Sequence, residues 1–246
     1  LTLDPHLDYT CAVLDEHEQV IATGSCFASS LRCFAVAREH QGEGLLNTVV
    51  SHLISVQAAR GNFHLFLYTK PAGARFFADL GFYEIARLEG TLVFMENRRR
   101  GFADFCGKLA GMRRPGSTAA IVMNANPFTL GHRYLVERAA GEYGTVHLFV
   151  LSEDASLFPT DVRYRLVREG VKDLPNVVLH PTEDYLISAA TFPCYFLRGG
   201  DAAIRANARL DLTLFTQIAA ALGVTARYVG DEPTSVVTGL YNEIMA

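Results

Sequence analysis

The sequence predicts an α/β protein built from two domains. From about residue 118 onward, apolar runs that suit buried strands alternate with stretches of helical periodicity, which is typical of a parallel sheet covered by helices. The first half mixes strand and helix patterns in a way that favours an α+β domain. With 246 residues the chain is long enough for both. We therefore expect domains at residues 1–112 and 118–246.

The first domain is expected to contain several strands around one long helix. Residues 30–37 form an apolar run typical of a buried strand. The stretch QGEGLLNTVVSHLISVQAA, residues 41–59, places aliphatic side chains on one helical stripe and polar side chains opposite, which predicts an amphipathic helix. Another strand is expected at residues 62–69. A short helix that ends at Gly81, a returning strand and the strand in TLVFMEN complete the domain.

A basic segment, ENRRRGFADFCGKLAGMRRPGST at residues 96–118, separates the two domains. It holds six of the chain's 22 Lys and Arg residues and carries Gly and Pro near its end. We expect a short helix followed by a linker at residues 113–117. The three arginines at 98–100 allow two interpretations, a solvated connector or a contact with phosphate or RNA, of which the connector is the commoner.

The second domain is expected to alternate strands and helices. Strands are predicted at residues 119–123, 146–151, 177–180 and 226–229, and helices from His132, from about Thr160 and at residues 201–222. Parallel strands place their carboxyl ends at one edge of the sheet. Ligands are therefore expected to gather at that edge.

The composition excludes several classes of protein. Half of the residues are hydrophobic, a fifth are charged and the net charge is −4, so the chain is globular and has no general attraction to nucleic acid or membranes. Its five cysteines are scattered without C-x-x-C spacing, which favours a reducing cytoplasm over disulfides or a zinc site. The longest apolar stretch, 212–226, is interrupted by Gln217, so no membrane span is expected. The chain starts at Leu1 and not at Met, which leaves a preceding segment open.

The stretch VMNANPFTLGHRYLVE, residues 122–137, holds the strongest functional signal. An apolar strand breaks into Asn-Ala-Asn-Pro-Phe, and a helical pattern starts at Gly131 and His132. A helix N-terminus leaves backbone N–H groups without intrahelical acceptors and carries a partial positive charge, so it suits a phosphate. Together with the Thr129 hydroxyl and the His132 imidazole, these amides predict a site that stabilises phosphate charge.

Thr129-Leu130-Gly131-His132 resembles the (H/T)-x-G-H signature of the nucleotidyltransferase superfamily, whose members attack the α-phosphate of a nucleoside triphosphate. Longer stretches, including SLFPTDVRYRLVREGVKDLPNV and VGDEPTSVVTGLYNEIM, are similar to the citrate lyase ligase family over nearly the whole chain. The resemblance implies a Rossmann-like second domain in a bacterial, cytoplasmic enzyme. It implies that acetate and ATP acetylate the prosthetic-group thiol of the citrate lyase acyl carrier subunit through acetyl-adenylate, with release of AMP and pyrophosphate.

The same resemblance implies an ATP site whose catalytic residues are His132 and Thr129. Mg²⁺ is expected to be held mainly by the phosphates, without a metal bound by the protein itself. The further ATP-binding candidates are Asn126, Phe128, Gly131, Arg163, Arg165, Ser188, Thr191, Gly230, Asp231 and Glu232. Four of them have a stated second interpretation. Asn126 also suits a turn cap, and Arg165 belongs to a basic stripe typical of a solvated helix face. Ser188 and Thr191 equally suit a polar loop without ligand contact.

In the first domain, QGEGLL at residues 41–46 follows a strand and opens a helix. It resembles the Q/R-x-x-G-x-G/A loop of GNAT acyltransferases, whose backbone amides hold the pyrophosphate of coenzyme A. The resemblance implies a GNAT-like domain that binds a coenzyme-A-like arm through Gln41, Gly42 and Gly44. Leu46 departs from the pattern, so acetyl transfer from acetyl-CoA is not expected. A structural remnant without a ligand is the alternative.

Three alternatives to the ligase stay open from the sequence: a transfer-RNA acetate ligase, a plain nucleotidyltransferase, and a non-enzymatic module that binds an acyl carrier. The acidic balance and the GNAT-like front domain disfavour the first, and the second would need no front domain. Nucleotidyltransferases usually carry an I-S-x-[ST]-x-[VI]-R stretch near their C-terminus, at a helix that binds the triphosphate. No such stretch follows LYNEIMA, so the second domain is expected to lack its C-terminal end.

Overall fold

The computed structural model describes residues 7–152, 157–186, 192–193, 200–230 and 236–245. The chain divides into two compact units, one made of Leu1–Gly101 with Pro193–Gly200 and the other of Phe102–Phe192 with Asp201–Ala246. They are termed the first and the second unit. The helix that follows Gly101 is thereby counted with the second unit, and the domain limits 1–112 and 118–246 stay a prediction.

The first unit is built on a six-stranded mixed sheet in the order β1-β2-β3-β4-β6-β5. Its neighbouring strands are antiparallel except for the parallel pair β3 and β4. The strands are β1 Tyr9–Leu14, β2 Val20–Phe27, β3 Ser30–Val36, β4 Phe66–Thr69, β5 Tyr83–Leu88 and β6 Leu92–Glu96. The helices are η1 Arg38–His40, α1 Leu45–Ala59, η2 Pro71–Gly73 and α2 Ala74–Ala78.

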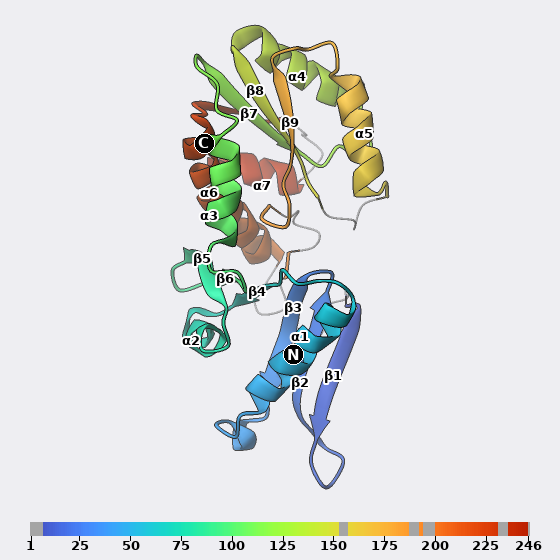
Figure 1. The fold of residues 1–246 in the computed structure, drawn as a ribbon, viewed down its shortest axis with the longest axis vertical. Coiled ribbons are helices and arrows are strands. Elements are labelled where there is room, and N and C mark those ends of the chain that lie inside the picture. The colour runs from blue at the N-terminus through green and yellow to red at the C-terminus, as the bar shows by residue number, and fades with distance from the viewer. Residues whose placement is uncertain (1–6, 153–156, 187–191, 194–199, 231–235, 246) are drawn as a thin grey trace. The chain divides into compact units, whose positions relative to one another are not determined.

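Helix α1 packs on this sheet through its apolar stripe, lying along the strands β1 to β3 in Figure 1. Val49, Val50 and Leu53 are at most 1% exposed and share one core with Leu31 and Leu67 of the two parallel strands. Each fully buried side chain of this size stabilises the fold by about 1.5–3 kcal/mol relative to an exposed one. The amphipathic helix expected within residues 41–59 is confirmed, and it begins at Leu45.

The second unit contains a four-stranded parallel sheet in the order β10-β7-β8-β9. Its strands are β7 Thr118–Met123, β8 Thr145–Val150, β9 Val177–Pro181 and β10 Ala226–Tyr228. The helices are α3 Gly101–Ala110, α4 Leu130–Glu142, α5 Thr160–Gly170, α6 Gly200–Leu222 and α7 Val236–Met245. The predicted α/β fold class, with a parallel sheet in the second half, is confirmed.

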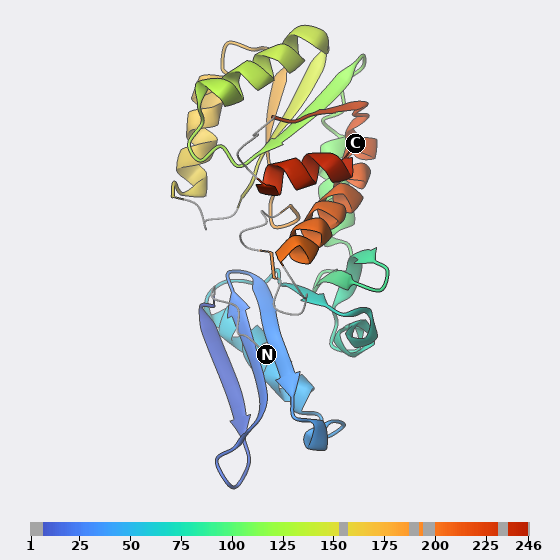
Figure 2. The same ribbon diagram turned by 180° about the vertical axis from the view of Figure 1, so that it is seen from behind.

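Helices cover both faces of the parallel sheet, because alternate residues of a strand point to opposite sides. On one face Leu148 shares a core with Val136 of α4 and Val167 of α5. On the other face the Phe149 ring meets the Phe215 ring of α6 edge-on, with 6.3 Å between their centroids. Figure 2 shows α6 and α7 on the side of the sheet that faces the viewer.

The observed elements differ from the expected ones mainly at their ends. The strand expected at residues 62–69 begins only at Phe66, because the N–H groups of Gly61 and Asn62 still donate to carbonyl oxygens of α1. Helix α5 begins at Thr160, but Pro159 takes the N-cap position and the Thr160 hydroxyl donates to the Ser152 carbonyl oxygen at 3.0 Å. Strands β1 and β2 and helix α7 are not among the predicted elements.

Candidate functional site

The loop between β7 and α4 forms a helix start that is capped by two of its own side chains. Thr129 is the N-cap residue, and its Oγ accepts a long hydrogen bond from the His132 N–H at 3.5 Å. In return, the Thr129 N–H donates to Nδ1 of the His132 ring at 3.1 Å. This reciprocal arrangement is a capping box in which His takes the place usually held by Glu or Gln. The two predicted catalytic residues are therefore in direct contact.

The cap determines which nitrogen of the neutral His132 ring carries the proton. A backbone N–H can only donate, so Nδ1 is an acceptor, and the Thr129 Oγ lies 2.8 Å from the same nitrogen. The neutral ring then carries its proton on Nε2, where it is a hydrogen-bond donor. The Phe128 ring stacks on the imidazole, with centroids 5.8 Å apart and an interplanar angle of 20°. An imidazole held in this way suits the stabilisation of phosphate charge.

The first turn of α4 is open to solvent. Leu130 is 87% exposed, and Thr129 and Gly131 are exposed as well. The first N–H groups of a helix have no intrahelical acceptor, and the helix dipole adds a partial positive charge there. A Cβ atom added to Gly131 would meet only the Thr129 hydroxyl, at 3.7 Å. The turn therefore leaves room for a phosphate against its amides.

Arg163 lies beneath this site and not at its surface. It is 0% exposed, and its guanidinium donates to the carbonyl oxygens of Phe158, Asn124 and Leu151 at 2.8–2.9 Å. It also donates to the Asn124 side chain and to the Thr160 hydroxyl, each at 2.9 Å. These bonds tie the ends of β7 and β8 to the start of α5. The prediction that Arg163 binds ATP has no geometric support, since a ligand would have to displace them.

The remaining candidates of the ATP site divide into three groups. The side-chain oxygen of Asn126 accepts from the Phe158 N–H at 3.0 Å, which ties this loop to the segment that precedes α5 and is not a cap of its own turn. Arg165 and Gly230 are exposed. The other candidates, Ser188, Thr191, Asp231 and Glu232, lie outside the described residues. For all of these, contact with ATP stays a prediction.

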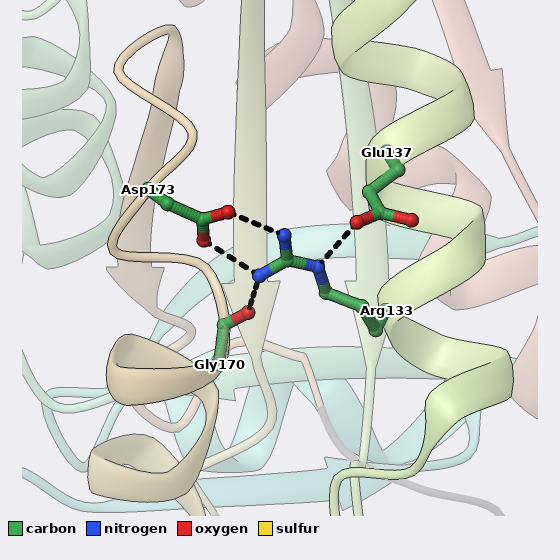
Figure 3. A network of polar contacts seen from close by, with 4 residues as sticks. All are labelled: Arg133, Glu137, Gly170 and Asp173. Atoms are coloured by element: carbon green, nitrogen blue, oxygen red, sulfur yellow. Dashed lines mark hydrogen bonds and ion pairs between the residues drawn. The ribbon is translucent and has the colours of Figure 1, made fainter.

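Arg133, which follows His132 directly, is a residue of this region that no sequence signal indicates. Its guanidinium forms two hydrogen bonds with the Asp173 carboxylate, at 2.7 and 2.6 Å, and a third with Glu137 at 2.7 Å. It also donates to the carbonyl oxygen of Gly170, so it fastens the start of α4 to the end of α5 (Figure 3). Hydrogen bonds from Arg133 lower the pKa of Asp173 to about 2. An arginine on an amphipathic helix gives no hint that its partners lie on another helix.

A buried pair of histidines lies away from this helix start, on β8 and β9. His147 and His180 are 0% and 2% exposed, and their rings share a hydrogen bond of 2.8 Å between Nδ1 of His147 and Nε2 of His180. Burial lowers the pKa of each to about 4, so both are neutral at pH 7. Nε2 of His147 has no hydrogen-bond partner among the described residues. The sequence places both with the surface or core histidines that lack ligand spacing, and the structure assigns them to the core.

The first unit has a pocket of about 740 Å³. It lies where the parallel strands separate, since β3 and β4 pair only at Ser30 with Phe66 and at Leu31 with Leu67. The predicted arm-binding residues Gln41, Gly42 and Gly44 all line this pocket, together with Phe34, Leu46, Tyr68, Phe76 and Phe77. The lining also includes the basic side chains of His40 and Lys70. An apolar wall with basic groups suits an anionic ligand that has an apolar or neutral chain.

The glycines of this loop are explained by the backbone. Gly42 and Gly44 have φ values of 94° and 79°, in the left-handed region that L side chains rarely adopt. Nothing lies within 4 Å of a Cβ atom added to either residue. Gly44 is the N-cap residue of α1, and no side chain caps that helix. The first turn of α1, Leu45 to Asn47, lines the pocket, and no capping side chain accepts from its N–H groups.

Within the part of the chain that the structure describes, no helix is long and apolar enough to cross a membrane. Across the same residues, no three His, Cys, Asp or Glu side chains come together as the ligands of a metal ion would.

The family of the protein follows from its known relatives. Residues 118–246 match the family model of the citrate lyase ligase C-terminal domain. The chain belongs to the citrate lyase ligase family. It is 42% identical to a citrate (pro-3S)-lyase ligase of Klebsiella pneumoniae over 97% of this chain and 70% of the relative. It is 40% identical to the Escherichia coli K12 protein of that name over 93% of this chain and 65% of the relative. The chain thus spans about two thirds of the length of these relatives.

Likenesses to three further proteins cover smaller parts of the chain. A phosphopantetheine adenylyltransferase of Staphylococcus haemolyticus is 37% identical over 28% of this chain and 44% of that protein. A GNAT-family acetyltransferase structure from Staphylococcus aureus is 12% identical over 35% of this chain and 65% of that one, with a TM-score of 0.32. The ribosomal-protein-S18-alanine N-acetyltransferase of Escherichia coli is 19% identical over 38% and 70%, also with a TM-score of 0.32. TM-scores this low carry no argument about function.

Proposed function

We propose that the protein activates citrate lyase by acetylating the prosthetic-group thiol of the acyl carrier subunit with acetate and ATP. One observation carries this proposal: an exposed helix start, capped by Thr129 and His132, in a chain that is 42% identical to a citrate (pro-3S)-lyase ligase. The family supports the overall reaction. The capped helix start supports the place where the phosphate chemistry occurs.

The proposed reaction has two steps, and neither needs a protein nucleophile. In the first, a carboxylate oxygen of acetate attacks the α-phosphorus of ATP, and the bond from this phosphorus to the bridging oxygen breaks. Pyrophosphate leaves with the electron pair of that bond, and acetyl-adenylate remains. In the second, the carrier thiolate attacks the acetyl carbon and AMP leaves. The thiol proton passes to water or pyrophosphate, so the products are the thioester, AMP and pyrophosphate.

The residues of the helix start act by stabilising charge. Negative charge builds on the α- and β-phosphate oxygens in the first step, and the His132 Nε2–H with the first amides of α4 donates to these oxygens. Thr129 holds the imidazole in this tautomer through the hydrogen bond from its N–H to Nδ1. Donors that are fixed before the reaction need no reorganisation when the charge develops. Mg²⁺ carried by the triphosphate would supply further neutralisation of the leaving pyrophosphate.

Exchange of labelled pyrophosphate into ATP tests the first step directly. We expect exchange that depends on acetate and does not need the carrier, since adenylate formation is reversible in the presence of pyrophosphate. Carrier acetylation that releases ADP and inorganic phosphate would contradict the adenylate. No exchange and no acetylation of the carrier, from a folded protein, would contradict the proposed function as a whole.

A second proposal concerns the pocket of the first unit, which we infer to hold the coenzyme-A-like arm of the carrier. The supporting observations are its place between the separating parallel strands, the lining by Gln41, Gly42 and Gly44, and the uncapped start of α1. Acetyl-CoA supplied without ATP distinguishes binding from catalysis. We expect no acetylation of the carrier under these conditions. Efficient acetylation would instead make the first unit an acetyltransferase.

A further inference from the structure

Phe128 connects the His132 ring to the far end of α5. One side of its ring stacks on the imidazole. A Cβ atom added to Gly170 would lie 2.7 Å from Cδ1 of Phe128 and closer still to Cε1, so a larger residue at 170 would displace the ring. Gly170 is not among the glycines with positive φ, so its backbone does not require glycine. Glycine at position 170 therefore leaves the space that the Phe128 ring occupies.

Gly170 also contacts the residue on the other side of the cap. Its carbonyl oxygen accepts a hydrogen bond from the Arg133 guanidinium, which is bound on both of its outer nitrogens by the Asp173 carboxylate (Figure 3). Phe128 directly precedes the Thr129–His132 cap and Arg133 directly follows it. The last residue of α5 thus contacts the chain on both sides of the predicted catalytic residues.

The exposure of this network argues that it sets geometry more than stability. The Arg133 and Asp173 side chains are 24% and 61% exposed, and ion pairs between exposed groups typically contribute about 0–1 kcal/mol. A bidentate pair between a planar guanidinium and a carboxylate nevertheless fixes direction, because both N–H···O bonds must be satisfied together.

We propose that Gly170, Arg133 and Asp173 are positioning residues for His132, acting through Phe128 and through the first turn of α4. The kinetic part of this inference rests on the proposed function, because it takes His132 as a donor to the phosphates. A small displacement of a preorganised donor changes the rate much more than it changes substrate binding.

Gly170→Ala is the central variant. We expect a decrease of at least about 10-fold in kcat of acetate-dependent pyrophosphate exchange, with KM for ATP changed by no more than about 2-fold. Gly141→Ala is the matched control, since it lies in α4 and nothing is within 4 Å of its added Cβ. An unchanged kcat for Gly170→Ala, or an equal loss in Gly141→Ala, would overturn the proposal.

A double-mutant cycle with Phe128→Leu tests the route of the effect. If the added methyl acts by displacing the Phe128 ring, Gly170→Ala should change kcat by only about 2-fold when that ring is already absent. The same fold-change in both backgrounds would show that the effect does not pass through Phe128, and would overturn the proposal.

Asp173→Asn tests the Arg133 contact on the other side of the cap without adding a side chain to the packed region. If Gly170→Ala does not fold, this variant tests the proposal in its place. We expect a loss of about 3-fold in kcat, because one charged partner of Arg133 is removed while Glu137 and Gly170 stay. Glu169→Gln is its control, a nearby exposed carboxylate that pairs with Lys172 at 3.2 Å. Equal kcat values for Asp173→Asn and Glu169→Gln would contradict the role of Asp173.

The nitrogen chemical shifts of the His132 ring separate this proposal from the proposed function. In the wild-type protein Nδ1 should show the shift of an acceptor nitrogen, and Gly170→Ala should move it while the thermal midpoint confirms a folded protein. If the wild-type protein catalyses no exchange, the proposed function fails but the ring signals still test the positioning. Identical His132 signals in wild-type and Gly170→Ala proteins would overturn it.

Discussion

The two helices that carry the predicted binding motifs at their N-termini, α1 and α4, begin in opposite ways. Helix α1 starts from Gly44 in a left-handed conformation, without a side-chain cap and in the lining of a pocket of about 740 Å³. Helix α4 starts from Thr129 in an extended conformation, with the Thr129 and His132 side chains closing a capping box, and its first turn is exposed. The first N–H groups of a helix lack intrahelical acceptors. In this chain a side chain caps them at α4, and no side chain caps them at α1.

The difference indicates which start binds and which takes part in chemistry. An uncapped start keeps all of its first amides for a ligand but offers no side chain of its own. The capped start gives the His132 N–H to Thr129 and gains an imidazole whose tautomer is fixed. We therefore expect substitutions at the start of α4 to lower the rate of pyrophosphate exchange, and substitutions at the start of α1 to weaken binding of the carrier.

Removing the imidazole should have the largest effect of all. We expect His132→Ala to slow acetate-dependent pyrophosphate exchange by about 10²–10³-fold, because one preorganised donor to the developing charge is lost. The thermal midpoint should change little, since the Thr129 N–H that loses its acceptor is open to water. His17→Ala, in an exposed turn of the first unit, serves as control and should keep the wild-type rate. Normal exchange in His132→Ala would contradict the site.

Much of this contrast is predictable from residue patterns. NPFTLGH after an apolar strand indicates a helix start with a hydroxyl and an imidazole, and QGEG indicates a start with two glycines and neither of those groups. The T-x-x-H spacing is also that of a capping box, with His at the position of Glu. Continuous apolar runs between helical stretches predict the strands of the parallel sheet to within one or two residues, because buried parallel strands are apolar on both faces.

What the sequence does not predict depends on contacts between distant segments. Arg163 looks like any other basic residue of an amphipathic helix, yet carbonyl oxygens from two strand ends surround it. Gly170 looks like a helix terminator, and its role against Phe128 appears only when α4 and α5 lie together. Local periodicity carries no information on which side chain another helix will contact, so the supporting residues of the site escaped prediction.

The start of α1 should respond in binding and not in chemistry. We expect Gly44→Ala to raise KM for the carrier by about 10-fold and to leave pyrophosphate exchange unchanged, because a methyl group at φ 79° strains the loop and occupies the space before its amides. Gly61→Ala is a matched control at the other end of α1, with φ 84° and equally open space. Equal effects of the two variants would assign the result to backbone strain and contradict the binding pocket.

A smaller effect is expected from an exposed arginine of α5. Arg165 lies on α5 with its side chain in solvent, as does Arg168 one turn later. If Arg165 reaches the triphosphate, Arg165→Ala should raise KM for ATP by about 2–5-fold, which corresponds to about 0.4–1 kcal/mol for an exposed charged contact. Arg168→Ala should leave KM unchanged. Identical KM values for the two variants would assign both residues to a solvated helix face.

The two units should also differ in their response to acid. Burial lowers the pKa of His147 and His180 in the second unit from 6.5 to about 4. Below pH 6.5 the unfolded chain takes up protons that the folded pair does not, so the free energy of unfolding falls as the pH decreases from about 6.5 to 4. Above pH 6.5 both histidines are neutral in the folded and in the unfolded state, so they add no pH dependence there. Asp173, whose pKa is lowered to about 2, loses its contribution only below its ordinary value of 3.8.

Thermal unfolding at pH 7 and pH 5, followed through NMR signals of each unit, measures this difference. We expect the midpoint of the second unit to fall by about 4–16 °C at pH 5, the shift that about 2–4 kcal/mol from the two histidines produces at about 2–4 °C per kcal/mol. The double variant His147→Leu/His180→Leu should remove most of that pH dependence, because replacing both partners of a buried hydrogen bond by apolar groups leaves no unsatisfied nitrogen. An equal fall of the midpoint in the double variant would assign the acid sensitivity to other groups, and the histidine pair would then have no part in the contrast between the units.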